Sequence, residues 1–210
     1  MSHRSAPELL ALHGVRVLGG PSVAAIAERF GMPAAEVREH LLDAQAFGWV
    51  TRYDYFGETW SLTERGRQVG EQKLADELVA TGTLDLVRRV HQDFLPLNVR
   101  HGIASTNWQL RPTRWDPRAF NDHTDPVWDH EVLTEFEAID AGFNALVGPL
   151  AEALQRFDGY AQLHSAAVAR ARAGQHAWLD APDRASCQLV WIQFHEDLLA
   201  SLGIPRGTDG

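Results

Sequence analysis

Apolar positions recur at steps of three and four along most of the chain, which is the spacing of helices that bury one face. In the first part of the chain these segments are short. They begin after Pro7, after Ser22 and near Pro33. The first two end at Gly19 and Gly31, and the hydroxyl group of Ser22 can cap the second. The pattern therefore predicts three short helices before residue 48.

The pattern changes after these helices. Two runs rich in β-forming residues, Trp49–Asp54 and Glu58–Leu62, flank a turn at Phe56–Gly57, which predicts a hairpin. Thr63 then stands where it can cap a further helix that continues to about Gly82. The expected order is helix, helix, helix, hairpin, helix, which is the order of a winged helix-turn-helix.

The rest of the chain has a helical pattern almost throughout. One polar, proline-containing stretch interrupts it at residues 104–129. Asp125–Pro126 opens a long amphipathic helix, and two more helices are expected at residues 160–173 and 183–202. We therefore expect a mainly α fold with one small β-hairpin, in which an all-helical region follows the winged helix-turn-helix.

Residues in the second and third helices resemble a known family of regulators. The spacing of a helix-turn-helix is present at Ala27, Gly31, Val37, His40 and Leu41. The segment "EVREHLLDAQAFGWV" is similar to the recognition helix of ArsR and MarR regulators, and "WSLTERGR" resembles the junction that closes the wing in MarR-type regulators. The resemblance covers residues 8–78 and implies a winged-helix transcriptional regulator that binds double-stranded DNA.

The third helix would present its polar face to a major groove. Its expected buried stripe is Val37, Leu41, Leu42 and Phe47. Arg38 can bind a guanine edge or a phosphate, and Glu36 can accept a hydrogen bond from a cytosine amino group. Further arginines would contact phosphates. The expected DNA-binding residues are Arg29, Ala34, Ala35, Glu36, Arg38, Glu39, Arg52, Arg65 and Arg67.

Charge limits this interpretation, because the net charge of the chain is −9. Residues 1–82 hold 8 basic and 11 acidic residues (−3), and residues 83–210 hold 11 and 17 (−6). Neither part attracts phosphate nonspecifically, so DNA contacts must come from local clusters. The wing tip "YDYFGE" also departs from the MarR pattern, which has an arginine there. A winged helix used for protein interaction, without specific DNA binding, is the alternative.

Two domains are expected from the change in pattern near residue 82. Residues 1–82 form the expected winged helix-turn-helix DNA-binding domain, and residues 83–210 the expected helical domain for dimerisation and effector binding. A homodimer is expected because one winged helix without a basic wing has little surface with which to specify a site. The long helices after residue 125 would supply the dimer interface.

Aromatic residues point to the second domain as the place where a small molecule is sensed. Five of the seven tryptophans lie beyond residue 82. Large aromatic faces with a few orienting polar groups suit a small aromatic or amphipathic ligand, although such tryptophans can also simply fill a helical core. The expected effector-binding residues are Asn107, Trp108, Arg111, Trp115, Trp128, His130, Trp191 and His195.

Other function classes have little support in the sequence. His123, Asp125, His130, Glu131 and Glu135 cluster near one helix start, but there is no H-E-x-x-H motif and no paired Glu-x-x-His, so we expect no metal. There is no nucleotide-binding glycine motif and no nucleophile motif, so no enzyme activity and no cofactor are expected. No apolar run is long enough for a membrane span, and the single cysteine fits a reducing compartment; we expect a cytoplasmic protein.

Overall fold

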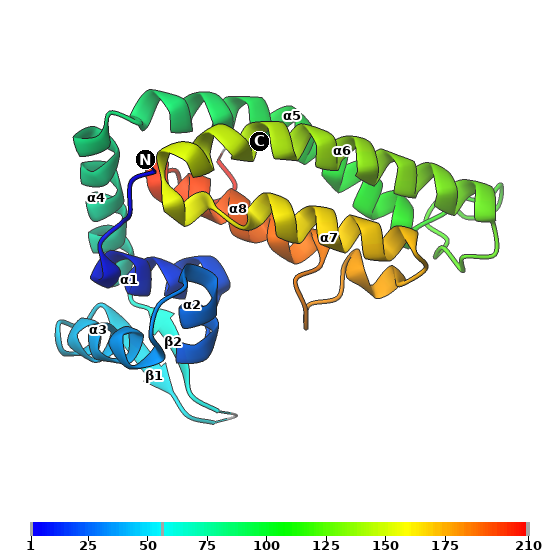
Figure 1. The fold of residues 1–210 in the computed structure, drawn as a ribbon. Coiled ribbons are helices and arrows are strands. Elements are labelled where there is room, and N and C mark those ends of the chain that lie inside the picture. Colours follow the sequence, from blue (N-terminus) through cyan, green and yellow to red (C-terminus); the bar gives the residue numbers. More distant parts are fainter. Residues whose placement is uncertain (1, 56, 209–210) are drawn as a thin grey trace. The chain divides into compact units, whose positions relative to one another are not determined.

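Helices make up most of the computed structural model, which describes residues 2–55 and 57–208 (Figure 1). Helices account for 68% of the described residues, which also contain one antiparallel sheet of two strands. This confirms the expected mainly α fold class with a small β-hairpin. The elements in chain order are α1 (Pro7–Leu18), α2 (Val23–Phe30), α3 (Ala34–Ala46), β1 (Val50–Tyr53), β2 (Thr59–Leu62), α4 (Glu64–Thr81), α5 (Leu84–Gln109), α6 (Pro126–Ala153), η1 (Gln155–Phe157), α7 (Tyr160–Arg172), η2 (His176–Trp178) and α8 (Cys187–Leu202).

Local capping groups set the ends of the short helices. Ser22 Oγ accepts a hydrogen bond from the backbone N–H of Ala25 at 3.2 Å, and Thr63 Oγ1 accepts one from Gly66 at 3.0 Å. α2 ends at Gly31, whose φ of 61° lies in the left-handed region that favours glycine. The caps expected at Ser22, Thr63 and Gly31 are therefore confirmed, because each depends only on residues a few positions away.

The hairpin pairs β1 with β2 in an antiparallel register. Both strands are shorter than expected, and Phe56 of the expected turn lies outside the described residues. Trp60 of β2 is fully buried, and its backbone N–H donates to the carbonyl of Pro21 at 3.1 Å. This bond ties the hairpin to the start of α2.

Gly66 allows α4 to begin directly against the preceding chain. A Cβ atom at this position would lie 1.8 Å from the carbonyl oxygen of Trp49, which is far inside van der Waals contact. The same carbonyl accepts a hydrogen bond from the backbone N–H of Thr63 at 2.9 Å. The segment "LTERGR" thus has a packing reason for its glycine.

The chain divides into two compact units. The first contains residues 1–88, 151–157 and 193–210, and the second contains residues 89–150 and 158–192. The boundary expected after residue 82 lies close to the first of these limits. The hydrophobic pattern does not predict that two later segments return to the first unit.

An apolar core in the first unit joins α1, α2, α3 and the hairpin. Val37 and Leu41 of α3 are fully buried in it, as expected. Leu42 and Phe47 are 44% and 58% exposed, so their expected burial is wrong. Leu42 lies about 100° around the helix from Leu41. Phe47 lies beyond the end of α3 and stacks on Trp49, with ring centroids 4.8 Å apart.

A charged cluster is also buried in the first unit. Arg156 of η1 pairs with Glu77 of α4 (Nε to Oε2, 3.1 Å) and with Asp197 of α8. His13 Nε2 of α1 lies 3.0 Å from Asp197 Oδ1. Burial by itself would raise the pKa of Asp197, but the charges of His13 and Arg156 hold it at about 2. These ion pairs attach residues 151–157 and 193–210 to the first unit.

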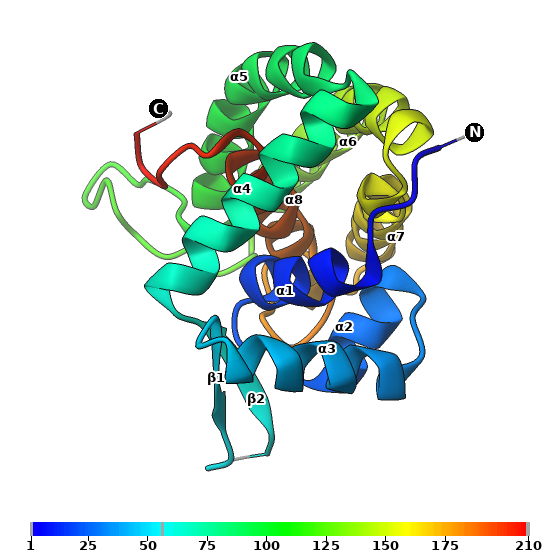
Figure 2. The same ribbon diagram turned by 90° about the vertical axis from the view of Figure 1, so that its left-hand side faces the viewer.

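The second unit is built from α5, α6, α7 and the first turns of α8, which lie side by side in Figures 1 and 2. Trp191 of α8 is buried among them. Its aromatic neighbours include Phe94 of α5, Phe143 of α6 and His101 of α5, with ring centroids 4.9, 5.1 and 4.2 Å away. The core of this unit is therefore largely aromatic.

None of the helices in the described part of the chain is by itself both long enough and apolar enough to cross a membrane. The pair α1 and α2, bent by 111°, passes the same test of length and composition when the two are taken together. Most of α1 is buried in the core of the first unit, and buried core helices commonly pass this test.

Candidate functional site

α3 presents one polar side to solvent. The opposite side carries Val37 and Leu41, which anchor the helix in the core. Of the residues expected to contact DNA, this helix holds four exposed ones and one that is half-buried: Ala34, Ala35, Arg38 and Glu39, and Glu36. The structure therefore brings these five together on the outer side of one helix.

Arg38, the central residue of this surface, is engaged by an acid of the hairpin. Its guanidinium donates two hydrogen bonds to Glu58 in a bidentate pair, at 2.9 Å (Nη1 to Oε1) and 2.5 Å (Nη2 to Oε2). The hydrogen bonds and charge of Glu58 raise the pKa of Arg38. The pair is partly open to solvent, since the side chains of Arg38 and Glu58 are 47% and 23% exposed. A phosphate or a base edge would have to replace Glu58.

The hairpin adds one more arginine and further acids to this surface. Arg52 of β1 lies 3.4 Å from Asp54 (Nε to Oδ2) and 4.0 Å from Glu58 (Nη1 to Oε1). Tyr55, near the expected wing tip, is 87% exposed. α3 and the hairpin together carry five acids against Arg38 and Arg52, a balance of −3: Glu36, Glu39, Asp43, Asp54 and Glu58.

A hollow of about 510 Å³ lies beside Arg38. Its walls are the first turns of α2 and α3, together with Arg38 and Glu58: Ser22, Val23, Ala24, Ala34 and Ala35. α3 has no side-chain cap, so the N–H groups of its first turn have no partner from a capping side chain. First-turn N–H groups and the helix dipole favour anions, so the hollow suits a phosphate oxygen once Glu58 has moved.

The remaining arginines expected at the DNA lie elsewhere or have other partners. Arg29 donates from Nη2 to the backbone carbonyl of Arg156 at 2.8 Å. Arg67 Nη1 is 4.0 Å from Glu196 Oε1. Arg65 is exposed in the first turn of α4. Arg38 and Arg52 join the α3 surface through their contacts with Glu58.

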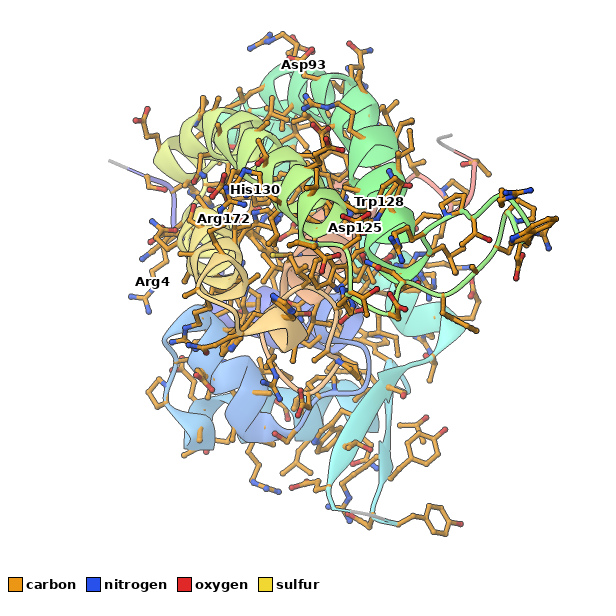
Figure 3. All side chains as sticks on the ribbon, turned by 90° about the vertical axis from the view of Figure 1, so that its right-hand side faces the viewer. Arg4, Asp93, Asp125, Trp128, His130 and Arg172 are labelled. Carbon is orange, nitrogen blue, oxygen red and sulfur yellow. The ribbon has the colours of Figure 1, made fainter. Side chains whose placement is uncertain are left out.

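The second unit has a groove of about 260 Å³ between α5 and α6. Two of the residues expected to bind an effector, Asn107 and Trp128, line it. The indole N–H of Trp128 donates to the backbone carbonyl of Asn107 at 2.8 Å. Trp128 lies near the start of α6, where Figure 3 labels it. The other lining residues are Arg100, Ile103, Ala104, Glu131, Val132 and Glu135.

The structure does not bring the other expected effector residues to this groove. Trp108 is buried, with its ring 4.4 Å from that of His123. Arg111 pairs with Asp125 (Nη1 to Oδ2, 2.9 Å). Trp115 is 80% exposed, with Arg114 stacked on its ring at 4.0 Å.

Three more expected effector residues do not line the groove. The carbonyl of His130 accepts a hydrogen bond from Arg172 of α7 at 3.4 Å, and Figure 3 labels both residues. Trp191 is buried in the core of the second unit, and its indole N–H donates to Asn98 Oδ1 at 2.8 Å. His195 belongs to the first unit.

His123 has an unusual backbone in the polar stretch before α6. It is the one non-glycine residue with a positive φ, 56°, among those described. Asp129 holds its ring, with Nδ1 to Oδ2 at 3.0 Å, and Asn121 donates to the same carboxylate at 2.8 Å. These contacts attach the polar stretch to the first turn of α6.

Two chemical features of the described residues are the placement of possible metal ligands and the state of the cysteine. No group of three or more His, Cys, Asp or Glu side chains is placed there to hold a metal ion. Cys187 is buried, and burial together with the charge of Asp140 raises its pKa to about 12. The thiol is therefore protonated at neutral pH.

Comparison of the chain with protein-family models, curated proteins and solved structures finds no match. The two surfaces therefore have to be interpreted from their own geometry and chemistry.

The sequence prediction missed several residues of these surfaces. Glu58 belongs to the α3 surface only because the hairpin folds back over 20 residues of chain. In the groove, the sequence prediction also did not include Arg100, Ile103 and Glu131 among the ligand contacts. They share a signal with Asn107 and Trp128, since the lining positions of both helices follow steps of three and four.

Proposed function

We propose that this chain is a cytoplasmic transcriptional regulator that binds double-stranded DNA through a winged helix-turn-helix formed by α1 to α4 and the hairpin. The observation that carries the proposal is the outer side of α3. Arg38 stands there beside a hollow formed by two helix N-termini, while Val37 and Leu41 anchor the other side. A helix anchored in this way can enter a major groove, and the hollow suits a backbone phosphate.

In this proposal DNA takes the place of Glu58 as the partner of Arg38. Exposed ion pairs contribute little free energy, so exchanging the carboxylate for a phosphate or a guanine edge is feasible. Glu58 would then lie close to the DNA and weaken binding through its negative charge. Binding is therefore expected to be selective and modest for one copy of the chain.

We also propose a homodimer with the second unit as its interaction and sensing part. A two-fold pair would place two α3 helices about 34 Å apart, one turn of the duplex, and double the contacts. A small molecule in the α5–α6 groove would change the affinity for DNA. Sedimentation of the full chain with and without duplex DNA tests the stoichiometry of two chains per site.

The decisive test of DNA binding is a salt titration with random duplex DNA. Phosphate contacts predict an affinity that falls steeply with salt concentration. On a selected operator, Arg38→Ala is expected to cost about 1–3 kcal/mol of binding free energy, as for one specific base contact. Arg88→Ala is the matched control, because Arg88 is also an exposed arginine in an ion pair, with Asp85 at 3.5 Å. Equal affinities for the two variants would remove Arg38 from the interface.

The acidic balance of the α3 surface favours one second candidate function. A winged helix with five acids around Arg38 and Arg52 can instead bind a basic segment of another protein. The same titration separates the two functions. Absence of binding to duplex DNA at low salt would favour the protein-interaction module.

A further inference from the structure

The groove between α5 and α6 has apolar walls and a charged rim. Ile103, Ala104 and Val132 form the apolar part, and Trp128 adds an aromatic ring. Ile103 is 56% exposed, so the apolar part of the groove is open to solvent. A hollow of about 260 Å³ suits the body of a small aromatic molecule.

The rim has more negative than positive charge. Arg100 Nε donates to Glu135 Oε1 at 2.8 Å, so these two side chains neutralise each other. Glu131 also lines the groove and makes no ion pair with any of the described residues. Glu131 therefore gives the rim of the groove one negative charge that no described cation pairs with.

Trp128 places an aromatic surface in the same groove. Its indole N–H is already satisfied by the carbonyl of Asn107, which fixes the ring and leaves the indole without a free N–H donor. The face of a tryptophan ring attracts cations through its quadrupole. Glu131 stands one helical turn from Trp128, so the two residues can act on the same positive charge.

We propose that the α5–α6 groove binds small hydrophobic organic cations, with the apolar body against Ile103 and the cationic group between Trp128 and Glu131. This deepens the sensing part of the proposed function, but the binding itself does not require that the chain binds DNA.

The test compares two ligands of the same shape, meta-hydroxyphenyltrimethylammonium and its uncharged carbon isostere meta-tert-butylphenol. Calorimetric titration of the full chain is expected to give roughly three- to tenfold tighter binding of the cation. Glu131→Gln should remove most of this preference and leave binding of the neutral isostere unchanged. Asp93→Asn is the matched control, because Asp93 is an exposed acid of α5 that does not line the groove and lies apart from Trp128 in Figure 3.

The place of binding is read from the indole N–H resonance of Trp128, assigned with Trp128→Phe. The cation is expected to shift this resonance. Equal affinity for the two ligands, an unchanged preference in Glu131→Gln or an unmoved Trp128 resonance would each overturn the proposal. Absence of any binding, with a dimer that dissociates in Ile103→Asp, would assign the groove to a second copy of the chain. No DNA is present in these measurements, so their outcome is independent of the test of DNA binding.

Discussion

Asp197 in the first unit and His101 in the second are both buried ionisable side chains, but only Asp197 stays charged at neutral pH. In the first unit, His13 and Arg156 surround the buried Asp197 and hold its pKa at about 2, so the group stays charged. In the second unit, burial lowers the pKa of His101 to about 3, with a further contribution from His164, so the imidazole stays uncharged. The direction of the pKa shift is the same, but it keeps the carboxylate charged and the imidazole uncharged.

This difference predicts two responses to acid. The stabilisation from Asp197 is present above its unfolded pKa near 4 and is lost as the pH falls toward 2. The unfolded chain takes up a proton at His101 below about pH 6.5, whereas the folded chain does so only near pH 3. The second unit should therefore begin to lose stability at a higher pH than the first.

The largest effect is expected from breaking the charged core. Arg156→Met leaves Glu77 and Asp197 buried without their guanidinium, which should cost about 3–5 kcal/mol of unfolding free energy. Urea denaturation at neutral pH measures the loss. Arg88→Met, which removes an exposed ion pair with Asp85, should change the stability by less than about 1 kcal/mol. A loss for Arg156→Met as small as this control would contradict a charged core.

Gly66→Ala should lower the stability of the first unit through a steric clash. The added Cβ atom would lie 1.8 Å from the carbonyl oxygen of Trp49, so the hairpin and α4 must separate. We expect a loss of about 3 kcal/mol or more in thermal or urea unfolding. Gly102→Ala on α5 is the control, because nothing lies within 4 Å of its added Cβ atom. Equal stability of the two variants would mean that α4 and the chain at Trp49 are packed less closely than in this structure.

A smaller effect, which depends on pH, is expected from the loss of His101. His101→Phe keeps a ring to stack on Trp191 but removes the titrating group. The wild-type chain should lose about 2 kcal/mol between pH 6.5 and pH 5 from this residue, and the variant should not. Unfolding free energies at the two pH values measure the difference. His130→Gln, at an exposed position of α6, should retain the wild-type slope. A variant slope equal to the wild type would show that His101 titrates normally.

The smallest effect is expected from surface ion pairs. Their removal should change DNA binding in the first unit but not in the second. Glu58→Gln removes the charge that engages Arg38, so DNA binding should strengthen roughly three- to tenfold if the proposed function holds. Glu135→Gln releases Arg100 in the same way but should leave DNA binding unchanged. Filter binding or anisotropy at fixed salt measures both. A weaker complex for Glu58→Gln would mean that Glu58 itself contacts the DNA.

Local sequence determined much of the first unit. The hydroxyl caps at Ser22 and Thr63, the left-handed Gly31 and the burial of Val37 and Leu41 depend on residues within one or two helical turns. The same periodicity misplaced Leu42 and Phe47, because an apolar residue at the edge of a stripe is buried only when another element covers it.

The sequence predicted only part of the two candidate surfaces. The pattern placed the outer residues of α3 together, and two of the residues that it assigned to a ligand, Asn107 and Trp128, line the groove. It did not identify Glu58 as the partner of Arg38, since the two lie 20 residues apart on different elements. It also did not identify Arg100 and Glu131 as walls of the groove, although they follow the helical spacing of Asn107 and Trp128.

The sequence by itself determined most of the helices, several of their caps, the hairpin and the acidic balance, because each is a property of near neighbours or of composition. It did not predict that α5 continues to Gln109, inside the stretch expected to interrupt the helices. Only the tertiary structure decided which charges are paired. Arg156 meets Glu77 across 79 residues and Asp197 across 41, and no local spacing specifies such contacts. Charge acts through space over distances that folding sets, so the partner of Arg38 in the expected DNA surface, Glu58, is also known only from the folded chain.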